Sequence, residues 1–204
     1  MSGTKGAPVI EVKDLNISFK TAAGVIKVVE NVSFSIGKGE CLAVVGESGS
    51  GKSVSALATI GLLVKDQSIV TGSVIFRGEE LLGKPESYMR KVRGGGISMI
   101  FQEPLSALNP VTTIGEQIAE VIVAHRKLSW KEAHKLAIGY LEQVEISQPE
   151  QRAKQYPHQL SGGMRQRAMI AMALSGEPSM IIADEPTTAL DVTIQAQVLD
   201  LLRR

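Results

Sequence analysis

Residues 46–53 read GESGSGKS, and the segments on either side of this stretch decide the fold class. The apolar run ECLAVV at 40–45 comes directly before it, and residues 52–63 follow with apolar side chains at helical spacing. A strand, a glycine-rich loop and a helix in this order predict a phosphate-binding loop, because glycine lets backbone amides approach phosphate oxygens. We expect Lys52 to reach the β- and γ-phosphates of a nucleotide, and the Ser53 hydroxyl to ligate Mg²⁺. A glycine-rich surface turn is the alternative, which the flanking strand and helix disfavour.

A second candidate phosphate site lies at 160–167, which read LSGGMRQR. The Ser-Gly-Gly turn leads into the periodic apolar stretch 168–174, so its amides become the free N–H groups of a helix N-terminus. Such an end concentrates positive dipole and binds anions. Because one nucleotide needs only one such loop, two of them suggest a nucleotide shared between two copies of the domain.

The run MIIADE at 180–185 reads as a short buried strand that ends in two acidic residues. Side chains alternate along a strand, so Asp184 and Glu185 are expected to diverge. Asp184 can then face Mg²⁺ while Glu185 addresses a water molecule aimed at the γ-phosphate. In isolation such a pair is usually a solvated loop, but a phosphate loop in the same chain favours the catalytic interpretation.

Composition limits the classes of protein to which the chain can belong. A chain of 204 residues with 44% hydrophobic side chains is expected to form one domain, and a net charge of +1 argues against a nucleic-acid partner. The single cysteine, Cys41, excludes an internal disulfide and suits core packing in a reducing compartment. Residues 1–8 are polar and glycine-rich and predict a disordered tail. No apolar run reaches the roughly 18 residues of a spanning helix, so any service to a membrane is expected through other chains.

The rest of the chain alternates between strand and helix patterns. Residues 9–19 and 25–36 are rich in β-branched side chains and predict two antiparallel strands. Ser129 and Glu132 form a capping box at the start of one helix. Further strands are expected at 40–45, 72–77, 97–102 and 180–183, and further helices at 52–63, within 112–144 and at 192–203. These patterns predict an α/β nucleotide-binding core.

Together these motifs resemble the ATP-binding cassette (ABC) ATPases over nearly the whole chain after the tail. The resemblance implies a P-loop (RecA-like) nucleotide-binding core with an N-terminal antiparallel β subdomain and an inserted α-helical subdomain. It also implies one domain over 9–204, in which 9–103 and 161–204 form the core with its β subdomain. The helical subdomain would then be 104–160.

The resemblance assigns further site residues. In this family the signature turn of one subunit closes over ATP held by its partner, so Ser161, Gly162 and Gly163 are expected to be ligands in trans. Gln102 is similar to the Q-loop glutamine, which senses Mg²⁺ and the transmembrane subunits, and Asp191 to the D-loop aspartate, which links the two sites across the dimer. Phe19 stands where the family has an aromatic that stacks on adenine, although a half-buried strand residue is an equal alternative. The expected ligands are ATP and Mg²⁺, and the expected catalytic residues are Glu185, Gln102 and Asp191. The expected metal ligands are Ser53, Gln102 and Asp184. The expected nucleotide-binding residues are Phe19, Gly46, Glu47, Ser48, Gly49, Ser50, Gly51, Lys52, Ser53, Ser161, Gly162 and Gly163.

Longer stretches, such as MIFQEPLSALNP at 99–110 and YPHQLSGGMRQR at 156–167, resemble the oligopeptide, dipeptide and nickel importer subgroup of bacterial ABC ATPases. This resemblance implies an ATP-hydrolysing subunit on the cytoplasmic face of the inner membrane. Its implied partners are a second ABC ATPase, identical or a paralogue, and two transmembrane permease subunits. An extracytoplasmic solute-binding protein would act with it indirectly.

One departure from the family pattern stands out. The family has a switch-loop histidine after the D-loop helix, whereas this chain ends at Arg204 and its histidines are His125, His134 and His158. We therefore expect an incomplete ATPase domain, and the alternative function is an ATP-binding module with little or no hydrolysis of its own.

An ABC ATPase of chromosome maintenance is disfavoured because the helical block lacks heptads. A translation-factor type would need two cassettes in one chain.

Overall fold

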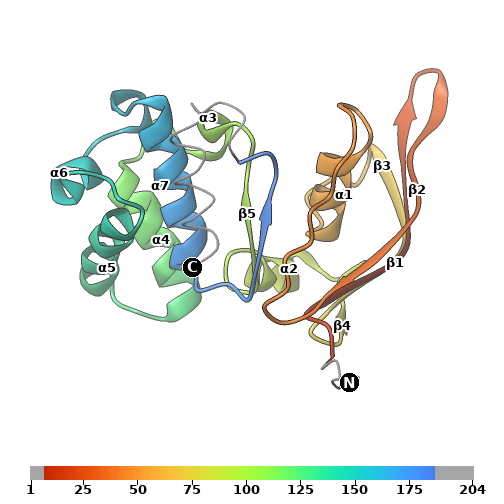
Figure 1. The fold of residues 1–204 in the computed structure, drawn as a ribbon, viewed down its shortest axis with the longest axis horizontal. Helices are drawn as coiled ribbons and strands as arrows, with labels where there is room; N and C mark the ends of the chain where they lie inside the picture. The colour runs from red at the N-terminus through yellow and green to blue at the C-terminus, as the bar shows by residue number, and fades with distance from the viewer. Residues whose placement is uncertain (1–6, 187–204) are drawn as a thin grey trace. The chain divides into compact units, whose positions relative to one another are not determined.

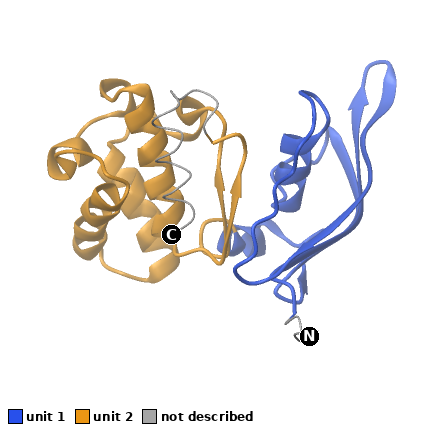
Figure 2. Cartoon of the chain, in the orientation of Figure 1, with its two compact units in different colours: residues 1–92 blue, residues 93–204 orange. Residues whose placement is uncertain are grey.

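The computed structural model describes residues 7–186 and divides into two units, residues 1–92 and residues 93–204 (Figure 2). We call them the N-terminal unit and the C-terminal unit. The helix expected at 192–203 and most of the tail expected at 1–8 lie outside the described residues. Within 7–186, none of the helices combines the length and the hydropathy that a bilayer-spanning helix needs.

An antiparallel sheet organises the N-terminal unit (Figure 1). Its strands follow the order β2 (Gly24–Ile36), β1 (Ile10–Thr21), β3 (Ser68–Phe76) and β4 (Glu79–Glu80). The hairpin of β1 and β2 is the one that the β-branched runs predict, and β3 confirms the strand expected at 72–77. Ile10, Leu15 and Ile17 are fully buried along β1, so the hairpin forms part of the core of this unit.

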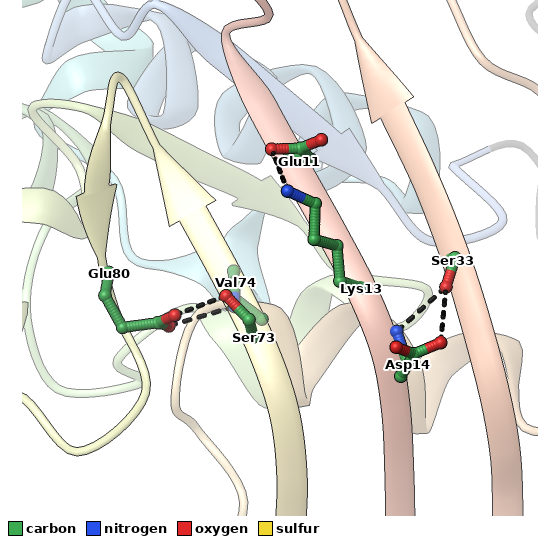
Figure 3. A network of polar contacts seen from close by, with 7 residues as sticks. All are labelled: Glu11, Lys13, Asp14, Ser33, Ser73, Val74 and Glu80. Atoms are coloured by element: carbon green, nitrogen blue, oxygen red, sulfur yellow. Dashed lines mark hydrogen bonds and ion pairs between the residues drawn. The ribbon is translucent and has the colours of Figure 1, made fainter.

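A bulge interrupts the pairing of β1 at Asp14, whose φ of 47° lies in the left-handed region. The Asp14 amide donates to Ser33 Oγ at 2.8 Å (Figure 3). On the other side, Gly72 packs so closely that a Cβ there would lie 2.5 Å from the Asp14 carbonyl oxygen. Only glycine fits at that position, and a bulge of this kind increases the local twist of a strand.

The expected strand at 40–45 is not present in the described structure. Residues 37–51 connect β2 to α1 (Lys52–Thr59), and none of the strands within 7–186 pairs with them. Val44 and Val45 are 62% and 92% exposed, and Cys41 is exposed as well. Apolar composition indicated a buried strand, but a strand needs a hydrogen-bonded neighbour, which this segment lacks here. The predictions of a strand at 40–45 and of a core position for Cys41 are therefore wrong for this structure.

The C-terminal unit combines two parallel strands with a helical layer (Figure 1). The strands β5 (Ile97–Ile100) and β6 (Met180–Ala183) confirm those expected at 97–102 and 180–183. Helix α7 (Gly162–Ser175) packs against β5 and against helices α4 (Ile114–Arg126) and α5 (Trp130–Gln143). The C-terminal unit also contains the short helices α3 (Pro104–Ala107) and α6 (Pro149–Ala153) and the 3₁₀ helix η1 (Pro157–Gln159). The short helix α2 (Glu86–Val92) belongs to the N-terminal unit.

Two capping boxes fix the starts of α4 and α5. The predicted box of Ser129 and Glu132 begins α5, and a second box of Thr113 and Glu116, which was not predicted, begins α4. The hydroxyl and amide of Ser129 hydrogen-bond the Glu132 carboxylate and hold its pKa below the ordinary value. Both helices bury an apolar face in the core of the unit, where Ile118, Ile122, Ala137, Leu141, Met169 and Ile170 are 1% exposed or less.

The Glu80 carboxylate ties the edge strand β4 to β3. It accepts hydrogen bonds from the Ser73 hydroxyl and from the amides of Val74 and Leu82, of which Figure 3 shows the first two. Burial opposes ionisation of this carboxyl group, but the hydrogen bonds outweigh burial and hold the pKa of Glu80 below its ordinary value.

This shift predicts how stability depends on pH. Because the folded-state pKa of Glu80 is depressed, its stabilisation is present above the unfolded-state pKa and is lost as the pH falls through the folded-state value. We expect Glu80→Gln to lower the free energy of unfolding by about 1 kcal/mol at pH 7, with the difference shrinking as the pH falls below the ordinary pKa of a glutamate. Urea denaturation at several pH values measures it. The control is Glu79→Gln, which removes a solvent-exposed ion pair with Lys84 and should change stability little. A pH-independent difference would contradict the assignment.

Candidate nucleotide-binding and hydrolysis site

The glycine-rich loop has the local geometry that its sequence predicts. Gly49 and Gly51 have φ angles of 80° and 92°, a region that other residues rarely adopt. Helix α1 begins directly after Gly51, where a Cβ would lie 2.8 Å from the side chain of Val29. At Gly46 a Cβ would lie 2.7 Å from Ser50 Oγ. Glycine at these positions keeps the backbone of the loop tightly curled before a helix N-terminus.

Lys52 provides the positive charge of this loop. Its Nζ donates to the carbonyl oxygens of Gly46 and Glu47 at 2.8 and 2.9 Å, so the ammonium group lies across the loop. Residues 46–50 are exposed, and Ser53 follows Lys52 in the first turn of α1. An ammonium group, backbone amides at a helix N-terminus and a hydroxyl form a donor set that suits a polyphosphate with its Mg²⁺. The chemistry of the loop therefore fits ATP.

The carboxylates follow β6 in the C-terminal unit. The Asp184 amide donates to the Ile100 carbonyl at 2.9 Å and so continues the pairing of β6 with β5. Glu185, the next residue, has a φ of 45°. Its Oε2 accepts a hydrogen bond of 2.8 Å from Gln102 Nε2, across 83 positions in the sequence. The structure thus brings together two of the expected catalytic residues, Gln102 and Glu185.

Ser161 caps helix α7, as the Ser-Gly-Gly turn predicts. Its Oγ accepts from the Met164 amide at 3.3 Å, and the helix begins at Gly162. Ser161 and Gly162 are exposed, and a Cβ built on Gly162 would meet nothing within 4 Å. The first turn of the helix holds no acidic side chain. This helix end is therefore open to solvent and suited to an anion.

The remaining expected site residues stay predictions. Phe19 is half-buried in β1 and pairs with Ile26 of β2 and Ser68 of β3, a position that neither supports nor excludes stacking on adenine. Asp191 lies outside the described residues. Within the C-terminal unit, the assignments of Asp184 to the metal and of Ser161 to a partner's nucleotide likewise stay predictions.

Gln166 was not among the site residues predicted from the sequence. This residue is 2% exposed on α7, and its Nε2 donates to the Pro186 carbonyl at 2.6 Å. The signal was available, because Gln166 shares a helix face with Ile170 and Ala173, four and seven residues on. A polar side chain on an otherwise apolar buried face calls for a hydrogen-bond partner.

A glycine-rich loop that opens α1, an acidic pair after the half-buried parallel strand β6 and an N-capped helix α7 define the class: a P-loop nucleotide-binding domain. The comparison with known families is in agreement, because the ABC transporter family model matches residues 29–188. The chain belongs to the ABC transporter family.

Two curated proteins of the same family are similar to this chain over nearly its whole length. The dipeptide transport ATP-binding protein DppD of Bacillus subtilis (strain 168) is 51% identical over 196 residues, which cover 96% of this chain and 58% of that protein. The oligopeptide transport ATP-binding protein OppD of the same strain is 51% identical over 195 residues, or 95% of this chain and 54% of that protein. The chain thus spans somewhat more than half the length of these relatives.

A solved structure supports the fold class. The ATP-binding cassette MJ0796, in a dimeric post-hydrolysis state bound to ADP and Pi, is 29% identical, with a TM-score of 0.83 over 95% of this chain and 81% of that one. The expected class, an α/β P-loop core with an antiparallel β subdomain and an inserted helical subdomain, is confirmed.

Nucleotide binding should depend on Lys52. A charge-assisted hydrogen bond contributes typically about 1.5–3 kcal/mol, so we expect Lys52→Ala to weaken ATP binding at least about tenfold in calorimetry. Lys65→Ala, which removes an exposed lysine elsewhere in the same unit, should leave the affinity unchanged. Equal affinities of the folded Lys52 variant and the unaltered chain would remove the phosphate-loop assignment.

Proposed function

We propose that the chain is the ATP-binding and ATP-hydrolysing part of a subunit that energises a membrane importer for dipeptides or oligopeptides, or for nickel. The observation that carries the transport assignment is the 51% identity, over 96% of this chain, to a dipeptide transport ATP-binding protein. The geometry of the glycine-rich loop and the Gln102–Glu185 contact support the chemistry.

In this proposal the nucleotide is bound mainly by the glycine-rich loop. The amides of 46–53 and the Lys52 ammonium bind the phosphates, and Phe19 stacks on the adenine. Ser53, Gln102 and Asp184 would hold Mg²⁺, which would neutralise part of the negative charge on the phosphate oxygens.

Hydrolysis is assigned to Glu185. Its carboxylate accepts a hydrogen bond from a water molecule and directs the water oxygen at the γ-phosphorus, in line with the bond to ADP that breaks. Gln102 supports this role because its amide already holds one carboxylate oxygen of Glu185 at 2.8 Å.

The proposal includes a second copy or a paralogous ATPase. Ser161, Gly162 and Gly163 at the open end of α7 bind the nucleotide of the partner, and Asp191 links the two sites. The dimeric structures of the cassette MJ0796 support a paired arrangement.

The surface proposed to dock the permease subunits begins after Gln102. Residues 104–122 open the proposed helical subdomain, 104–160, which contains α3 to α6 and η1. Leu105 and Val111 in this segment are 52% and 80% exposed, so both apolar side chains are accessible to a partner protein. Docking there places the chain at the cytoplasmic face of the inner membrane, with a solute-binding protein acting from the other side.

Replacing the Glu185 carboxylate tests the hydrolytic role. We expect Glu185→Gln to lower kcat by about 10²–10³ with little change in ATP affinity, because a positioned general base typically contributes about 10²–10⁴ in rate. Phosphate release and calorimetry measure the two quantities, and the exposed Glu142→Gln is the matched control. Tight ATP binding by the unaltered chain with no phosphate release would favour the alternative, a binding module without hydrolysis.

Crosslinking tests the docking surface. In a Cys41→Ser background, we expect Leu105→Cys and Val111→Cys to crosslink to a permease subunit in membranes, since both side chains are exposed on the proposed interface. Ala7→Cys, exposed at the start of the described chain, should not crosslink. Equal yields from all three positions would show that the docking surface is wrong.

A further inference from the structure

One buried amide side chain in the C-terminal unit lies next to the turn that carries Glu185. Gln166 is 2% exposed, and Met169 and Ile170, three and four residues further along its helix, are fully buried and apolar. An amide in such surroundings is unfavourable unless it is hydrogen-bonded. The structure gives it a main-chain partner, the Pro186 carbonyl, at 2.6 Å.

The turn that it contacts is under conformational constraint. Strand β6 ends at Ala183, and the hydrogen bond from the Asp184 amide to the Ile100 carbonyl, at 2.9 Å, continues the ladder by one residue. Glu185 then takes a φ of 45°, in the left-handed region that L-residues rarely adopt. It also precedes a proline, which favours extended backbone at the preceding residue. Such a conformation persists only where the surrounding structure holds it.

We propose that Gln166 is a positioning residue for Glu185. By donating to the Pro186 carbonyl it fixes the far side of the turn, while the pairing of Asp184 with β5 fixes the near side. The Glu185 carboxylate is thereby held where Gln102 Nε2 reaches it at 2.8 Å. This inference rests on the proposed function only for its kinetic consequence, since the effect on the turn itself does not require hydrolysis.

Two variants separate positioning from a general contribution to the core. Gln166→Met removes the donor and keeps the length of the side chain. Ser175→Ala is the matched control, because Ser175 lies fully buried on the same helix and donates from Oγ to the Met172 carbonyl at 2.9 Å. Both variants lose one buried hydrogen bond of α7, but only the first loses a contact with the turn.

Amide hydrogen exchange of the intact chain measures directly how strongly the turn is held. We expect exchange in peptides covering 180–186 to be at least about tenfold faster in Gln166→Met than in the unaltered chain. In Ser175→Ala the same peptides should keep their exchange rates. Unchanged exchange in Gln166→Met, or an equal increase in both variants, would overturn the inference whether or not the chain hydrolyses ATP.

The rate of ATP hydrolysis then tests whether the turn positions the Glu185 carboxylate. Gln166→Met should lower kcat about tenfold and leave KM for ATP within about twofold, because a small misplacement of a reacting group slows chemistry more than binding. In the Glu185→Gln background it should cause no further loss, whereas a merely structural role would lower turnover equally in both backgrounds. Equal losses would overturn positioning of Glu185. Full turnover by Glu185→Gln alone would instead refute the proposed function, and the exchange measurement would still decide the role of Gln166 in the turn.

Discussion

Ile100 pairs with Ala183 where β5 and β6 end, and the two strands run parallel. Parallel strands present their carboxyl ends at the same edge of a sheet, so the residues that follow them become neighbours. Gln102 and Glu185 each lie two residues beyond this last pair, and their side chains meet at 2.8 Å. A shift of one residue in this register would turn one of the two side chains to the other face. The proposed hydrolysis therefore depends on the register of a short strand pair, which α7 covers and the helical layer supports.

The N-terminal unit brings backbone amides and one ammonium group together at the glycine-rich loop, as the proposed nucleotide binding requires. Glycines at 46, 49 and 51 permit the curl, and α1 supplies the helix end. The antiparallel hairpin approaches the loop through Val29 of β2, which packs against Gly51. The ammonium of Lys52 turns back onto the carbonyls of its own loop, where an incoming phosphate would compete for the same donors. The proposed nucleotide binding and the proposed hydrolysis thus depend on different parts of the structure, the glycine-rich loop and the ends of β5 and β6. For this reason each is tested by its own variant.

Local signals predicted much of this structure. The capping box at Ser129, the hairpin of β1 and β2 and the start of α7 at the Ser-Gly-Gly turn each follow from a few neighbouring residues, and each is confirmed. The strand predicted at 40–45 was wrong because apolar composition reports suitability for burial, whereas a strand also requires a partner. The bulge at Asp14 depends on Gly72 from another strand, and the Gln166–Pro186 contact joins residues 20 positions apart. Such tertiary contacts leave only a weak trace in a single sequence, such as a lone glutamine on an apolar helix face.

The contact between Gln102 and Glu185 is the central claim about the site, and the side-chain amide resonance of Gln102 tests it most directly. In the isotopically labelled chain, with the signal assigned through Gln102→Met, Glu185→Ala should shift this resonance strongly. The amide of Gln117, which bonds the main chain at Asn109 and Thr112, serves as the internal reference and should not move. A large shift confined to Gln102 is the result that the structure predicts. Identical Gln102 signals with and without the Glu185 carboxylate would contradict it.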